Sequence, residues 1–299
     1  MGIKKSIFPL LFPAIVIFFS FNSYASAEEI TSLVKPGAVP KSVQSDFILD
    51  RTEGPATDAD GNIYFTEALG KRILKWSSSD GEISVYKQSD VEVIGMTFDS
   101  EGRLIVCESG NHRLIRDDLK GNITVLADSY EGNNLMRPND VWVNPKGGIY
   151  FSDMQIYYIS PDEKKITRVT DDIEGANGVI GTPDGKTLYV GGREDIWLFR
   201  IRPDGSLTDK RPFCKALTSD GLAMDERNNL YVTVRGGPLI VYNSRGEKIE
   251  EIPYPDIVYN MKFGGKDRKT LFLCCQKSVY TLEMAVKGAS TALDMATGN

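Results

Sequence analysis

The amino-acid sequence predicts an all-β fold, a six-bladed β-propeller. From Asp46 onward, short runs of aromatic and β-branched residues alternate with turn residues, and no long segment has the period of a helix. The central residues of these runs follow one another at steps of 41, 45, 39, 42 and 41, at Tyr64, Ile105, Tyr150, Tyr189, Tyr231 and Phe272. A period of about 40 residues with four strand patterns per unit is typical of propeller blades. A two-sheet sandwich, the alternative architecture, does not require this repeat.

Each repeat carries its signals in the same order. A turn such as "DADGN" or "TPDGK" precedes the central run, and a second hairpin pattern such as "RILKW…GEISVY" follows it. The sixth unit has too few strands, because the pattern ends near Met284. We therefore expect an N-terminal strand, in "SVQSDFILD" at 43–50 or so, to close the last blade and remove an exposed sheet edge. This places the propeller at 43–284, after a lead-in at 28–42 and before a polar tail at 285–299.

The first 27 residues have the order of a secretory signal peptide. Lys4 and Lys5 precede an apolar run from 7 to 21, and small residues follow at Ala25 and Ala27. The run of 15 residues is shorter than the roughly 20 that a membrane-spanning helix needs. We therefore predict cleavage after Ala27 and an exported protein, periplasmic or secreted, with no membrane contact after cleavage. An uncleaved N-terminal anchor is the alternative.

Composition argues against several other classes of function. A net charge of −6 argues against a nucleic-acid partner, which usually requires a basic face. The spacing of the four cysteines, Cys107, Cys214, Cys274 and Cys275, matches neither a zinc site nor a dense disulfide framework, and it favours buried free thiols. The single histidine, His112, lies in a predicted turn with no "GxSxG" nearby, which argues against a serine–histidine nucleophile.

A polar residue recurs at the entrance to the innermost predicted strand of five repeats. Counting back eleven or twelve residues from each aligned central residue gives Glu53, Ile94, Asn139, Asn177, Asp220 and Asn260. In a propeller these positions converge near the axis at one mouth of the central channel. Turn formation is the simpler explanation, and it accounts for Asn177 and Asp220, which precede glycines. It does not account for Glu53, or for five polar residues at one phase of the repeat.

A ring of carboxylate and amide oxygens predicts a site for one hard divalent cation. Calcium takes six to eight oxygen ligands of these kinds and is our first choice. Magnesium, manganese or adventitious zinc are alternatives. The ring holds no histidine or cysteine, which argues against a dedicated zinc or copper site.

These motifs resemble those of the gluconolactonase/regucalcin family, also called the senescence-marker-protein and luciferin-regenerating-enzyme family. The similarity runs from "EGPATDADGNIYFTE" through "RPNDVWVNPKGGIYFSD", "NGVIGTPDGKTLYV" and "DGLAMDERNNLYVT" to "FGGKDRKTLFL". The resemblance implies a six-bladed propeller with one divalent metal in its axial channel. It implies that Glu53, Asn177 and Asp220 are metal ligands. It also implies that Asn139 binds substrate or completes the metal shell, and that Arg137 contacts substrate.

The residues and the resemblance together predict the hydrolysis of a sugar-type lactone, a small-molecule substrate. The metal would polarise the lactone carbonyl while water attacks it. Asp220 is the candidate that accepts the proton from water. Arg137 would hold hydroxyls or a carboxylate through a forked contact, and Asp140 would orient the metal ligands from behind.

Two other functions remain open. The short segment after Asp153 leaves room for bulkier substrates, so an organophosphate or aryl ester could be hydrolysed at the same site. Alternatively, the protein could be a non-catalytic binding propeller with a structural calcium ion. Arg137 beside Asn139 favours catalysis, because a structural ion does not need an arginine nearby. The sequence does not specify the oligomeric state.

Overall fold

The computed structural model describes residues 1–2, 32–216 and 219–298. The chain divides into two units, Met1–Thr31 and Ser32–Asn299, and only the second is described below. Apart from residues 1–2, the predicted signal peptide at 1–27 lies outside the described residues. Within the described ranges, no helix has the length and apolar character needed to cross a bilayer.

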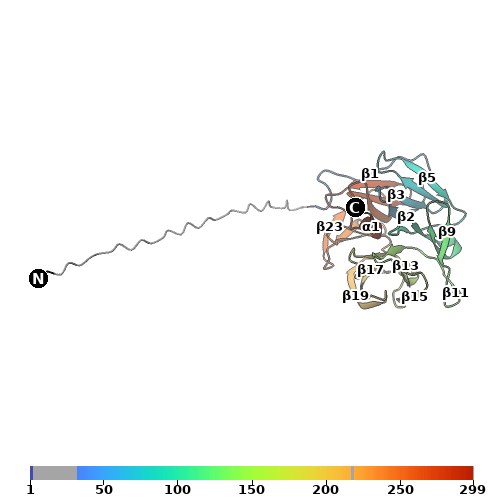
Figure 1. Ribbon diagram of the computed structural model, residues 1–299. Helices are drawn as coiled ribbons and strands as arrows, with labels where there is room; N and C mark the ends of the chain where they lie inside the picture. The colour runs from blue at the N-terminus through green and yellow to red at the C-terminus, as the bar shows by residue number, and fades with distance from the viewer. Residues whose placement is uncertain (3–31, 217–218, 299) are drawn as a thin grey trace. The chain divides into compact units, whose positions relative to one another are not determined.

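The second unit is a six-bladed β-propeller, as the sequence predicts (Figure 1). The first three blades are β2 (Thr52–Thr57), β3 (Ile63–Glu67), β4 (Arg72–Trp76) and β5 (Ile83–Gln88); β6 (Met96–Phe98), β7 (Leu104–Glu108), β8 (Arg113–Asp117) and β9 (Ile123–Ala127); and β12 (Val141–Val143), β13 (Ile149–Asp153), β14 (Gln155–Ile159) and β15 (Ile166–Arg168). The other three are β16 (Val179–Gly181), β17 (Thr187–Gly191), β18 (Asp195–Ile201) and β19 (Leu207–Lys215); β20 (Leu222–Met224), β21 (Leu230–Val232), β22 (Leu239–Tyr242) and β23 (Lys248–Ile252); and β24 (Val258–Gly264), β25 (Thr270–Cys275), β26 (Val279–Glu283) and β1 (Lys41–Ser42).

The innermost strand of each blade contacts the innermost strand of the next. These contacts run from β2 through β6, β12, β16, β20 and β24 and return to β2, which closes the ring. A small hairpin of β10 (Ser129–Tyr130) and β11 (Asn133–Asn134) lies between the second and third blades in sequence. A short 3-10 helix, η1 (Ser109–Asn111), follows β7.

The last blade is closed by an N-terminal strand, but this strand lies earlier than the sequence indicates. Residues 41–42 form β1, and Lys41 pairs with Thr281 of β26. The prediction of a strand at 43–50 is therefore wrong in position. The apolar side chains of Val43, Phe47 and Leu49 pack instead against the core between the first and last blades. Burial of these side chains thus carries the segment away from the sheet edge.

The recurring turns between the first two strands of a blade are stabilised by their own side chains. In the fifth blade, Asp225 Oδ1 accepts hydrogen bonds from the backbone N–H groups of Arg227 and Asn229, each at 2.9 Å. Asp99 makes the same pair of contacts in the second blade, with Glu101 and Arg103. Such local bonds explain why aspartate or asparagine begins so many of these turns.

The C-terminal segment, predicted only as a polar tail, packs on the propeller. It contains α1 (Ala292–Thr297), which Thr291 and Asp294 begin with reciprocal capping hydrogen bonds. Leu293 is 4% exposed and packs into the core of the first two blades. Arg268 forms an ion pair with Asp294 and fixes the helix to the last blade. Figure 1 shows α1 near the centre of the ring. Ala292 and Asp294 of this helix line a cavity with Lys262 at the ends of the innermost strands opposite to Asn139.

The prediction of buried free thiols is confirmed for three of the four cysteines. All four are free thiols; Cys107, Cys274 and Cys275 are buried, whereas Cys214 is partly exposed. Burial raises the pKa of the Cys107 and Cys274 thiols well above the usual value. These thiols are therefore core residues without nucleophilic character.

Candidate functional site

One mouth of the central channel opens into a pocket of about 480 Å³. Five of the predicted site residues line it together: Glu53, Arg137, Asn139, Asn177 and Asp220. Four of these lie at or just before the start of an innermost strand, so the phase of the repeat correctly predicts their convergence. Ile94, the apolar exception in the ring, lines the same pocket.

Close packing of the strands explains the glycines that follow these residues. A Cβ on Gly178 would lie 2.2 Å from the backbone oxygen of Asp220, and a Cβ on Gly221 would lie 2.5 Å from Asn260 Cα. Neither glycine has the positive φ angle of a tight turn. The Asn-Gly and Asp-Gly pairs therefore reflect the close approach of neighbouring blades near the axis. Turn formation does not explain them.

Asn177 and Asp220 are joined directly across two blades. Asn177 Nδ2 donates a hydrogen bond of 2.8 Å to Asp220 Oδ1. This contact orients the Asn177 amide so that Oδ1 has no hydrogen-bond partner, although the atom is buried. Among the described residues it is the one buried side-chain nitrogen or oxygen in that condition. An unpaired buried carbonyl oxygen costs about 1–3 kcal/mol, so a ligand for it is expected.

Glu53 is a buried carboxylate close to other acids. Its side chain is 6% exposed, and Oε2 accepts a hydrogen bond of 3.2 Å from the Gly54 N–H. Burial raises the pKa of Glu53 well above its usual value, and the charges of Asp220 and Asp140 raise it further. Burial likewise raises the pKa of Asp220 to about 6. A buried and a half-buried carboxylate that repel each other favour a positive ligand between them.

Asp140 lies behind the mouth. It lines a small internal cavity with Asn260, and its Oδ1 accepts a hydrogen bond of 3.2 Å from Asn260 Nδ2. Asn260 in turn favours the charged form of Glu53 through a side-chain hydrogen bond. Burial raises the pKa of Asp140 to about 7, and the charge of Asp220 contributes to this rise. Asn260 thus links Asp140 to Glu53 through side-chain hydrogen bonds. The sequence did not specify this link.

The mouth fits an oxygen-coordinated cation better than a nitrogen- or sulfur-coordinated one. In the described part of the chain, no group of three or more His, Cys, Asp and Glu side chains could hold a metal ion. The converging donors include only two carboxylates, Glu53 and Asp220, and the rest are amide oxygens of Asn177 and Asn139. Calcium and magnesium accept such mixed oxygen sets. The unpaired Oδ1 of Asn177 is the structural feature that fits this interpretation best.

Arg137 is held at the rim by two acidic residues. Its Nη2 lies 3.0 Å from each carboxylate oxygen of Glu92, and the side chain is 53% exposed. Its backbone N–H donates to Asp153, which also accepts the Met136 N–H at 2.7 Å. Asp153 is buried and therefore fixes the loop that presents Arg137.

Three arginines at the mouth escaped the sequence analysis. Arg51, Arg193 and Arg235 line the pocket together with Arg137. Arg51 directly precedes β2, whereas Arg193 and Arg235 follow the second strand of their blades. A search for charged residues at the phase of these loops could have found them. They do not share the repeat position of the ring residues at the entrances of the innermost strands, so that pattern does not reveal them.

The single histidine does not contribute to this mouth. His112 is exposed and bonds through Nδ1 to the backbone oxygen of Met136. It is absent from the pocket lining. His112 ends η1 in a left-handed turn conformation, but its ring contact reaches the loop before β12, 24 residues away, so its role extends beyond its own turn.

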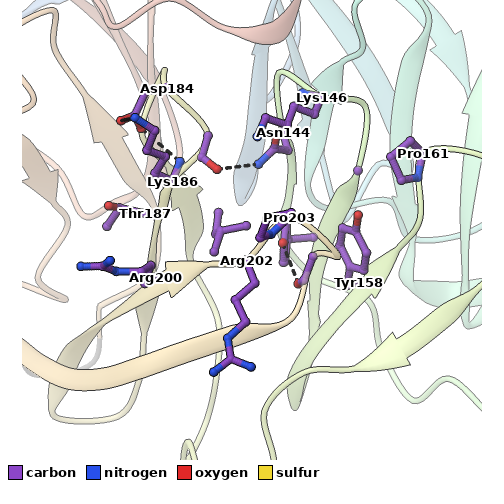
Figure 2. A pocket seen from close by; sticks show the side chains of 15 residues that line it. Asn144, Lys146, Tyr158, Pro161, Asp184, Lys186, Thr187, Arg200, Arg202 and Pro203 are labelled. Atoms are coloured by element: carbon purple, nitrogen blue, oxygen red, sulfur yellow. Dashed lines mark hydrogen bonds and ion pairs between the residues drawn. The ribbon is translucent and has the colours of Figure 1, made fainter.

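A second pocket, of about 550 Å³, lies between the third and fourth blades. It includes the turn residues Asn144 and Asp184, which follow β12 and β16, so it lies at the ends of these strands opposite to the mouth. Figure 2 shows that the side chains of Lys146, Arg200 and Arg202 point in different directions and do not converge on a common point. This pocket therefore lacks the convergent polar groups of a binding site.

Comparison with known proteins assigns the family. The model of the SMP-30/Gluconolactonase/LRE-like region matches residues 51–276, which include all the residues of the ring. The chain belongs to this family.

Individual relatives of the SMP-30/gluconolactonase family support this assignment. Lactonase drp35 of Staphylococcus saprophyticus is 28% identical over 229 residues, which cover 68% of this chain and 69% of the relative. The structure of a gluconolactonase from Xanthomonas campestris is 26% identical with a TM-score of 0.77, covering 84% of this chain and 91% of that chain. Regucalcin, a calcium-binding protein from Agrobacterium tumefaciens, is 18% identical with a TM-score of 0.74, covering 85% of this chain and 96% of that chain. At this last identity the likeness shows the fold alone.

Proposed function

We propose that this protein is a divalent-metal-dependent lactonase that opens a sugar-type lactone. The family supplies the reaction class, and the buried, unpaired Oδ1 of Asn177 beside Glu53 and Asp220 carries the proposal of metal dependence. Glu53, Asn177 and Asp220 would hold the cation, with Asn139 as a further oxygen donor. Calcium is the first choice because the donors are all oxygens.

A bound divalent cation polarises a carbonyl and makes water more acidic. The chain's own residues supply the other functions. Asp220 Oδ1 accepts the Asn177 amide N–H and keeps a second lone pair that could face the cation. Oδ2 is then the oxygen that would accept a proton from the attacking water. The bond from the water oxygen to the carbonyl carbon forms, and the ring carbon–oxygen bond breaks. The ring oxygen leaves as a hydroxyl after taking a proton, which Asp220 can return.

Arg137 would position the substrate at the rim. Its guanidinium is half-exposed and directed by Glu92, and Asp153 fixes its backbone. A planar, forked donor suits sugar hydroxyls or a carboxylate. Asp140 would act from behind by orienting Asn260 and, through it, Glu53.

The test is hydrolysis of D-glucono-1,5-lactone by the protein starting at Glu28, followed with a pH indicator and corrected for spontaneous hydrolysis. The metal-stripped protein is assayed alone and with calcium, magnesium, manganese or zinc. We expect turnover only with metal, and its loss in Asp220→Ala. Turnover without metal would refute metal dependence. A bound metal with no turnover on any lactone would support the binding-propeller alternative.

We also propose that the protein is exported and cleaved after Ala27. The support is the order of basic, apolar and small residues in the first 27 positions. Expression of the full chain followed by mass spectrometry of the exported fraction should give a mature protein that begins at Glu28. An intact N-terminus in the membrane fraction would indicate the anchor instead.

A further inference from the structure

Four arginine side chains surround the mouth. Arg51 precedes β2, Arg137 precedes β12, Arg193 lies between β17 and β18, and Arg235 lies between β21 and β22. They come from four different blades and line one pocket. The whole chain carries a net charge of −6, so these four positive charges are opposite in sign to the net charge of the protein.

The arginines are not equally neutralised. Arg51 and Arg137 share a single carboxylate, that of Glu92. Arg193 pairs with Glu174 at 2.8 Å, but both side chains are largely exposed, which makes the pair weak. In the parts of the chain that the structure describes, Arg235 has no ion-pair partner. The lining residues Glu53 and Asp220 are the remaining acids of the pocket.

The charge balance depends on the cation. Four acidic side chains face the four guanidinium groups: Glu53, Glu92, Glu174 and Asp220. A divalent cation held by Glu53 and Asp220 would neutralise those two carboxylates. Only Glu92 and Glu174 would then oppose the four arginines, which leaves an excess of two positive charges at the mouth. A neutral sugar lactone would leave this excess uncompensated.

The position of Arg235 makes it the arginine that is available to bind a substrate group. Arg235 and Asp220 line the same pocket, so the guanidinium lies close to the proposed reaction centre. Arg235 and Gly236 lie at an exposed turn after β21, and Arg235 lines the pocket. Unlike Arg137, it is not directed by a carboxylate.

We propose that the substrate is a lactone with an anionic substituent, a carboxylate or a phosphate, and that Arg235 binds this substituent. The proposal rests on the proposed lactonase function and narrows its substrate class. Arginine matches the planar, two-oxygen edge of these groups better than any other side chain. With the lactone carbonyl near Glu53 and Asp220, the anionic end would extend toward Arg235 across the same pocket.

The test compares two lactones with the same five-membered ring. D-Glucaro-1,4-lactone carries a free carboxylate, whereas D-glucono-1,4-lactone is neutral. Arg235→Gln removes the charge. Arg227→Gln is the matched control, because Arg227 is an exposed arginine at the opposite end of β21 in the same blade. We expect the anionic lactone to have the higher kcat/KM, and Arg235→Gln to lower it about tenfold with little effect on the neutral lactone.

A binding measurement separates this inference from the proposed reaction. Calorimetry with the calcium-loaded protein measures the affinity for D-glucarate, 6-phospho-D-gluconate and D-gluconate. Tighter binding of D-glucarate or 6-phospho-D-gluconate than of D-gluconate, lost in Arg235→Gln and kept in Arg227→Gln, supports the proposal and identifies the preferred anion. The binding result supports the role of Arg235 even if neither lactone is hydrolysed. In that case only the proposed reaction is refuted. Equal affinity for all three ligands, or unchanged affinities in Arg235→Gln, would overturn the inference about Arg235. Any turnover of a lactone would still support the proposed reaction.

Discussion

Asn177 donates its amide N–H to Asp220 at 2.8 Å and thereby leaves its own carbonyl oxygen buried without a partner. The two residues come from the fourth and fifth blades, and both lie at the entrance of an innermost strand. An apolar side chain at residue 177 would avoid the cost of the unpaired oxygen. An asparagine at this position is explained if a ligand of Oδ1 offsets the cost. A divalent cation would also suit the neighbouring carboxylates.

The first prediction concerns Asn177 itself. Asn177→Ala should weaken calcium binding at least about tenfold, because it removes one oxygen ligand and releases Asp220. It should change the stability of the metal-free protein little, since losing the hydrogen bond and losing the unpaired oxygen offset each other, each being about 1–3 kcal/mol. Calcium-induced shifts in Tm measure both effects. Asn243→Ala, at a partly exposed turn outside the pocket, is the control. An equal calcium response in the unaltered protein and both variants would contradict this explanation.

The second prediction concerns pH. Asp140 and Asp220 have folded-state pKa values raised from 3.8 to about 7 and about 6. A raised carboxyl pKa means that the folded state binds protons more tightly than the unfolded state. The metal-free protein should therefore be most stable near pH 4–5 and lose stability as pH rises toward 7. Urea unfolding in the presence of a chelator should show this decline, and calcium should diminish it.

Asp140→Asn tests whether the buried charge of Asp140 destabilises the metal-free protein at high pH. The asparagine keeps an oxygen that can accept the hydrogen bond from Asn260 and removes the buried charge. We expect the metal-free variant to be more stable than the unaltered protein at pH 8 and to depend less on pH. Asp162→Asn, at an exposed turn, should not change the pH profile. If Asp140→Asn is less stable at pH 8, the charge on Asp140 stabilises the fold and the explanation is wrong.

The third prediction concerns the loop that carries Arg137. Asp153→Ala removes the acceptor of the Met136 and Arg137 N–H groups, so Arg137 should lose its fixed position. We expect KM for the lactone to rise about tenfold while the calcium affinity stays the same. Asp153→Asn, which keeps one acceptor oxygen, should have a smaller effect. An unchanged KM in Asp153→Ala, with the fold intact by circular dichroism, would show that Arg137 does not need this support.

The fourth prediction concerns the C-terminal helix. Leu293 is 4% exposed in the core of the first two blades, whereas Met295 of the same helix is 42% exposed. Leu293→Ala should lower the free energy of unfolding by about 2–5 kcal/mol. Met295→Ala should change it by less than about 0.5 kcal/mol. Urea unfolding of both variants checks this, and equal effects would mean that α1 does not belong to the folded unit.

The repeat made much of the fold and of the mouth predictable from the sequence. A strict phase of strands and turns determines the blades, and the same phase identifies Glu53, Asn139, Asn177 and Asp220 as neighbours. These residues are far apart in the chain, and only the ring geometry brings them together. The glycines after Asn177 and Asp220 were compatible with a turn in the sequence. Only the distances between blades show that close packing requires them.

Features outside the repeat were harder to predict. The closing strand lies at Lys41–Ser42 because Val43 and Phe47 are used for packing, a choice that strand propensity does not reveal. The helix at Ala292–Thr297 is short and lies in a polar segment, so its role depends on contacts with distant blades. The four-arginine rim arises from loops whose lengths differ, and its charge balance requires the ion pairs of Glu92 and Glu174.

The central claim is that one divalent cation at the mouth is needed for lactone hydrolysis. The most direct test is to titrate the metal-stripped protein with calcium from zero to two equivalents, and to measure the initial rate on D-glucono-1,5-lactone at each step. The account predicts that the rate rises in proportion to calcium and levels off at one equivalent, and that Asn177→Ala shows no such break. A rate that is already full in the stripped protein, or that never appears with calcium bound, would contradict it.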